Sequence, residues 1–141
     1  MADDRKRGAF LTVVAALFAL LTLSNFTKAL QYANNPTVGG IVIFGVRAEG
    51  VATNLLLGPL VGLVTGAYAY GLWRMKRWVL PLSVAYAFYV PVNLVLFWYR
   101  HTEATVPPVA GLLVYLAIAL GGSIGTALHL AYHRGELPWT E

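Results

Sequence analysis

The stretch that decides the fold runs from residue 50 to residue 99 and reads GVATNLLLGPLVGLVTGAYAYGLWRMKRWVLPLSVAYAFYVPVNLVLFWY. It contains two uncharged runs, Gly50–Trp73 and Trp78–Tyr99, on either side of the basic turn Arg74-Met75-Lys76-Arg77. A helix needs about 20 apolar residues to cross a hydrocarbon core of about 30 Å, and both runs are long enough. Backbone polar groups in lipid must be paired within their own segment, so each run predicts a transmembrane helix.

Two further uncharged runs flank this pair, Gly8–Thr27 and Ala104–His133. The chain of 141 residues is 58% hydrophobic and 11% charged, whereas a soluble domain is about 45–50% apolar and about 25% charged. We therefore predict an all-α polytopic membrane protein, with four transmembrane helices bundled in a single domain. The spans are expected at about 8–27, 52–73, 78–99 and 108–133, with a loop over 28–51.

The few charges predict the orientation of these spans. Four spans place both termini on one side of the membrane, together with seven of the ten Lys and Arg residues. These seven are Arg5, Lys6, Arg7, Arg74, Lys76, Arg77 and Arg134. Positive charge collects on the cytoplasmic side, so we predict cytoplasmic termini in the inner (plasma) membrane and a non-cytoplasmic loop 28–51. Topology and attraction to the lipid bilayer explain the basic clusters, and no nucleic-acid partner is expected.

Two predicted spans carry small residues at four-residue spacing, which lets another helix approach closely. The stripes are Gly58, Gly62 and Gly66 in the second span, and Ala117, Gly121 and Gly125 in the fourth. Either stripe would serve packing inside one bundle or contact with another subunit. Because so small a bundle has little lipid-free interior, we expect a protein that acts by helix–helix association. It would be a homo-oligomer or an accessory subunit of a larger membrane complex.

Polar residues gather at the predicted outer ends of the spans. The candidate ligand-binding residues are Asn25, Arg47, Asn54, Tyr86 and Asn93. An outward-facing polar pocket lined by Asn25, Arg47, Asn54 and Asn93 would suit a small channel or transporter. Tyr86 shares with Asn93 a face of the third predicted span that mixes aromatic and amide groups, so this face is expected to look inward, either for hydrogen bonding between helices or toward a ligand. The alternative without a ligand site is an ordered lid with solvated charges, in which the segment 31–53 is re-entrant, interfacial or a short hairpin.

The sequence contains few residues that could serve as catalytic groups or metal ligands. The chain has no cysteine, and no Asp or Glu lies within any predicted span. His129 and His133 share a helix face, but the spans supply no third ligand, and histidine near a helix C-terminus interacts well with the helix dipole. We therefore predict no metal, no cofactor and no catalytic residues, and proton-coupled transport is disfavoured because a relay of acidic residues is missing.

Two resemblances accompany these patterns. Gly71-Leu72-Trp73, followed by Lys76-Arg77-Trp78 and by Asn93-Leu94, resembles a class of small uncharacterised bacterial four-helix membrane proteins. Val46-Arg47-Ala48, with Asn54 and Pro59 following, resembles the second-helix motif of the membrane-associated eicosanoid and glutathione (MAPEG) enzymes. The MAPEG resemblance implies a four-helix membrane enzyme that handles lipophiles or thiols, although the Glu of that motif is absent. An enzyme of this kind is the alternative to the non-enzymatic role.

Overall fold

The computed structural model describes the backbone of residues 4–37, 39–100 and 109–136, and the side chains of residues 8–37, 39–100 and 116–135. The fold is predominantly helical, which confirms the all-α class. In chain order the elements are α1 (Asp4–Phe26), α2 (Lys28–Asn34), β1 (Val42–Ile43), β2 (Val46–Arg47), α3 (Val51–Trp73), α4 (Val79–Arg100), α5 (Val109–Tyr132) and a 3-10 turn, η1 (Arg134–Glu136).

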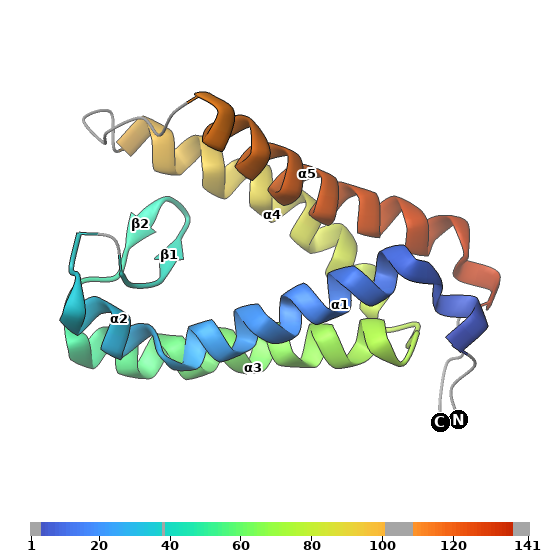
Figure 1. Cartoon of the computed structure of the whole chain (residues 1–141), viewed down its shortest axis with the longest axis horizontal. Coiled ribbons are helices and arrows are strands. Elements are labelled where there is room, and N and C mark those ends of the chain that lie inside the picture. The colour runs from blue at the N-terminus through green and yellow to red at the C-terminus, as the bar shows by residue number, and fades with distance from the viewer. Residues whose placement is uncertain (1–3, 38, 101–108, 137–141) are drawn as a thin grey trace.

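The helices form two antiparallel pairs arranged as a V (Figure 1). One arm consists of α1 packed along α3, and the other of α4 packed along α5. The arms meet near the start of α1 and the end of α5, which we call the closed end, and diverge toward the opposite, open end. The β1–β2 hairpin lies in the space between the arms at the open end (Figure 1).

Three of these helices are long and apolar enough to cross a membrane, namely Gly8–Phe26 within α1, Val51–Trp73 and Val79–Arg100. The described part of α5 adds a shorter apolar helix, Leu116–Tyr132. Their outward faces carry large apolar side chains, as shown by Leu56 (70% exposed) and Phe88 (73% exposed). Such faces are costly in water but match the hydrocarbon interior of a bilayer.

The helices begin and end where the local sequence no longer supports helix. Gly8 has φ +70° and separates the charged start of α1 from its apolar part, while Gly50, with φ +84°, precedes α3. In the last turn of α3, a Cβ on Gly71 would collide with the Val79 side chain at the start of α4, so only glycine allows this close approach. The buried Met75 adopts φ +53° and reverses the chain between the arms.

The buried core lies toward the closed end, where α1, α3, α4 and α5 meet, the last through the buried Leu130. Leu11 and Phe18 of α1 pack with Tyr68 and Leu72 of α3 and with Val79 of α4. The core is therefore at the apex of the V, and at the open end the two arms are connected through the hairpin.

Candidate functional site: a hairpin held between two helix pairs

The hairpin is a two-strand antiparallel unit in which Val42 pairs with Arg47 and Ile43 with Val46. Of the three conformations considered for segment 31–53, the structure contains the short hairpin. Its turn residues Phe44 and Gly45 both have positive φ, 48° and 73°, as a two-residue type I′ turn requires. Gly45 satisfies this at little cost, whereas Phe44 is strained and gains contact with an aromatic ring on α4.

Asn54 attaches the hairpin to the first arm. This side chain is fully buried in the first turns of α3. Its Oδ1 accepts a hydrogen bond from the Ile41 N–H at 2.8 Å. Its Nδ2 donates to the carbonyls of Ala48 (2.8 Å) and Gly50 (2.9 Å). One amide therefore holds both ends of the hairpin against α3.

Asn93 attaches the hairpin to the second arm. The Gly45 N–H donates to Asn93 Oδ1 at 2.8 Å. The Phe44 and Tyr89 rings meet edge to face, with centroids 5.4 Å apart. A Cβ on Gly45 would lie 2.5 Å from the Leu96 carbonyl carbon, so the turn sits directly on the α4 backbone. The hairpin is thus a brace between the two arms.

The two cations beside the hairpin are bound to neutral groups. Arg47 Nη1 donates to the Gly39 carbonyl (2.9 Å), and Lys28 Nζ donates to Gln31 Oε1 (3.0 Å). Partial burial lowers the pKa of Lys28 from its ordinary value, and the nearby positive charge of Arg47 lowers it further. These contacts shape the loop by hydrogen bonding to uncharged oxygens.

Asn25 lies apart from the hairpin, in the contact between α1 and α3. Its Nδ2 donates to Thr65 Oγ1 at 3.3 Å, and Thr22 Oγ1 donates to the same oxygen at 3.1 Å. The structure therefore brings Arg47, Asn54 and Asn93 together around the hairpin and places Asn25 in a separate polar contact. The side-chain amides of this group are all engaged in hydrogen bonds within the chain.

Tyr86 belongs to an aromatic series that follows the inside of the V from the core to the hairpin. Successive ring centroids are separated by 4.6 Å (Phe18–Tyr68), 5.9 Å (Tyr68–Tyr86), 6.3 Å (Tyr86–Tyr89) and 5.4 Å (Tyr89–Phe44). Tyr68 is 4% exposed, and its hydroxyl has no hydrogen-bond partner among the residues that the structure describes. The Ser83 hydroxyl donates its hydrogen to the Leu80 carbonyl at 2.7 Å.

The glycine stripe of the second predicted span faces α1. A Cβ on Gly58 would lie 2.5 Å from the Asn25 carbonyl oxygen, one on Gly62 2.9 Å from the Phe26 ring, and one on Gly66 3.2 Å from Thr22. These glycines let α1 and α3 approach closely within one chain, as small residues do between membrane helices.

The small residues of α5 have a different environment. A Cβ on Gly121 would meet no heavy atom within 4 Å, whereas one on Gly125 would lie 3.3 Å from the Phe10 ring of α1. The residues at 117, 121, 124 and 128 are exposed on one face, and Gly125 at the margin of this face is partly covered by Phe10. We call this face the α5 stripe; it comprises Ala117, Gly121, Ile124 and Leu128.

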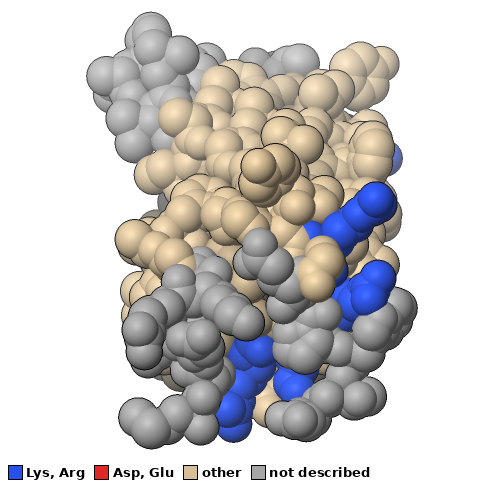
Figure 2. All heavy atoms as spheres, turned by 90° about the vertical axis from the view of Figure 1, so that its right-hand side faces the viewer, with Lys and Arg blue, Asp and Glu red and all other residues tan. Residues whose placement is uncertain are grey.

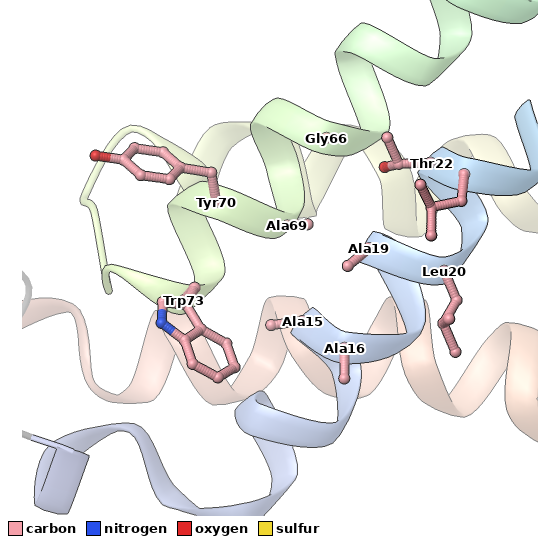
Figure 3. Close-up of a pocket in the computed structure, with 10 residues that line it drawn as sticks. Ala15, Ala16, Ala19, Leu20, Thr22, Gly66, Ala69, Tyr70 and Trp73 are labelled. Carbon is pink, nitrogen blue, oxygen red and sulfur yellow. The ribbon is translucent and has the colours of Figure 1, made fainter. Parts of the chain in front are cut away.

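A groove between α1 and α3 was not predicted from the sequence (Figure 3). It has a volume of about 630 Å³, and its lining is almost entirely apolar. Ala15 and Ala19 of α1 point toward Ala69 and Trp73 of α3, and these short side chains leave the space between the helices open. The signal was present as alanines four residues apart in the first span, opposite the small residues of the second.

The closed end of the molecule is basic. Figure 2 looks onto this end and shows Lys and Arg side chains gathered there, with no acidic side chain among the residues it colours. The described cations of this end are Arg74, Lys76, Arg77 and Arg134. The side chains of Arg5, Lys6 and Arg7, which were predicted to share this side, lie outside the described residues.

The rings of His129 and His133 at the end of α5 are tilted by 40° with their centroids 4.7 Å apart, and the His129 centroid lies 5.6 Å from that of Phe10. Among the described residues, no three His, Asp or Glu side chains form a group that would hold a metal ion. Comparisons of the whole chain with protein-family models, with curated proteins and with solved structures find no match.

Proposed function

We propose that the chain is a four-span inner-membrane protein with cytoplasmic termini, and that it works as a subunit of a membrane assembly by docking another transmembrane helix on the α5 stripe. The observation that carries this proposal is the open space at Gly121, where an added Cβ meets no atom within 4 Å. The equivalent spaces at Gly58, Gly62 and Gly66 are filled by α1.

The shape of the α5 stripe supports this role. Ile124 (41% exposed) and Leu128 (67% exposed) project beside the flat surface at Ala117 and Gly121. A partner helix would gain dispersion contacts by placing its side chains over the small residues and against these two. The second copy of this chain is one such partner, and a different membrane protein is the other.

The decisive experiment compares Gly121→Ile with Ala67→Ile, a matched change on the exposed face of α3. Gly121→Ile should dissociate the assembly in mild detergent, measured as a smaller particle by light scattering, while the melting temperature stays unchanged. Ala67→Ile should alter neither property. Gly62→Ile should instead lower the melting temperature, because its side chain would collide with Phe26. An unchanged particle size and unchanged co-purifying chains for Gly121→Ile would refute the proposal.

The proposed topology has its own test, because the native chain contains no cysteine. A single cysteine introduced at Glu49 should react with an impermeant maleimide added outside intact cells. One introduced at Gly135 should react only after permeabilisation. Labelling of both positions from the same side would contradict four spans.

A further inference from the structure

The groove between α1 and α3 has the dimensions of a site for a single lipid chain. Its lining extends from Ala15 to Leu23 along α1, which corresponds to about 12 Å at the rise of an α-helix. One leaflet of a bilayer offers roughly half of the 30 Å hydrocarbon core, or about 15 Å. The volume of about 630 Å³ lies within the roughly 300–1,000 Å³ that small-molecule sites occupy.

A cation stands at the end of this groove. The Arg74 guanidinium lies 5.9 Å from the centroid of the Tyr70 ring, which is within cation–π range. Tyr70 and Trp73 both line the groove at its end nearest the α3–α4 turn. The side chain that holds Arg74 therefore also forms the wall of the apolar space, and positive charge is presented where an acyl chain would leave it.

We propose that this groove binds one anionic glycerophospholipid, with an acyl chain between α1 and α3 and its phosphate beside Arg74. An apolar groove one leaflet long, ending at a cation on the basic end of the molecule (Figure 2), matches the two parts of such a lipid. A second copy of the chain fits less well. Copies inserted in the same orientation would place their basic turns at the same depth as Arg74, and the like charges would repel each other. This proposal rests on the membrane insertion proposed above.

Trp73 provides a direct test, because its indole lines the groove. A protein retaining Trp73 as its single tryptophan, with the other three replaced by Phe, is reconstituted in nanodiscs of unlabelled phosphatidylcholine. Phosphatidylglycerol or phosphatidylcholine with brominated acyl chains, which quench indole fluorescence on contact, is then added at a low fraction. We expect half-maximal quenching at a several-fold lower fraction of the brominated phosphatidylglycerol.

Two variants separate the two parts of the site. Arg74→Gln should reduce the preference for phosphatidylglycerol roughly fivefold, as expected for one cation near a membrane surface, while Arg100→Gln at the other end of the molecule should leave it unchanged. Ala19→Phe fills the groove and should weaken quenching by both brominated lipids. Ala67→Phe, on an exposed face outside the groove, is its control.

The outcomes distinguish this proposal from simple insertion into lipid. A protein retaining only Trp98 should be quenched equally by both lipids, which would report insertion alone. If neither single-tryptophan protein is quenched, insertion fails and the lipid site fails with it. If Trp98 is quenched but Trp73 shows no headgroup preference, or the preference survives Arg74→Gln, the lipid proposal is wrong and insertion stands. A change in oligomeric state for Ala19→Phe with unchanged quenching would assign the groove to a second copy and overturn the proposal.

Discussion

Replacing Asn54 by alanine should release the hairpin from the first arm of the V. The substitution removes the acceptor for the buried Ile41 N–H and the donor for two carbonyls, those of Ala48 and Gly50. An unpaired buried N–H costs about 1–3 kcal/mol, and each lost hydrogen bond about 0.5–1.5 kcal/mol. Because water partly replaces the lost partners of the two carbonyls, we expect the free energy of opening the hairpin to fall by about 2–4 kcal/mol.

Amide hydrogen exchange measured in detergent or nanodiscs gives the free energy of this opening directly. A decrease of about 2–4 kcal/mol in the free energy of opening corresponds to amide exchange that is roughly 30- to 1,000-fold faster. The effect should appear at the Ala48 N–H, which donates to the Ile41 carbonyl at 2.8 Å. The amides of the α1–α3 core, such as that of Leu72, should keep their protection.

Asn34→Ala is the matched control, since Asn34 is exposed in α2 and should change exchange little. Asn54→Asp adds a sharper contrast. It keeps the acceptor for Ile41 but places a carboxylate against two carbonyls, so it should destabilise the hairpin at neutral pH and less at acidic pH. If exchange at Ala48 in Asn54→Ala stays within threefold of the native rate, the hydrogen bonds of Asn54 do not hold the hairpin.

Other substitutions test the second arm, the partly buried lysine and the aromatic series. Gly45→Ala should loosen the hairpin from the second arm by more than about 1–2 kcal/mol, the cost of a left-handed alanine, because its Cβ collides with the α4 backbone. Gly135→Ala, whose Cβ meets no atom within 4 Å, should leave the hairpin unchanged. Hydrogen exchange of the hairpin amides measures the difference between the two variants. The lowered pKa of Lys28 means that the folded state releases its proton first, so stability should rise with pH between that pKa and 10.5. Chemical denaturation should show that Lys28→Met removes this rise and Arg47→Met reduces it; an unaltered pH profile in both variants would exclude Lys28 as its source. Tyr68→Phe should leave the melting temperature equal or higher, because it deletes a buried hydroxyl that has no hydrogen-bond partner within the described part of the chain; a clear drop in melting temperature would contradict this reasoning.

The helical class followed from the charges, because uncharged runs such as Val51–Trp73 have no way to pair their backbone in lipid except as helices. The inward face of α4 was equally readable. Tyr86 and Asn93 are half-buried on it, while Phe88 between them is exposed. Helical spacing places the first two on one face and the third on the opposite one.

The candidate site was less predictable from the sequence, since composition identifies polar side chains but not their partners. Asn54 and Asn93 were expected to line a pocket, and their amides are bonded to the hairpin backbone. That outcome depends on where the backbone of residues 41–50 passes, which no periodicity in this segment reveals. The groove between α1 and α3 depends in the same way on the register of Ala15 and Ala19 against α3.

The division of the hairpin contacts between two arms implies an order of assembly during synthesis. Chains emerge N-terminus first and fold in units. The α1–α3 pair and the Asn54 contacts need only residues up to Trp73, so we expect the first arm and the hairpin to be able to form before α4 is available to pack on them. Asn93 is synthesised later and accepts its hydrogen bond from a Gly45 N–H that is already in position. In that order of events the hairpin is the surface on which the second arm docks.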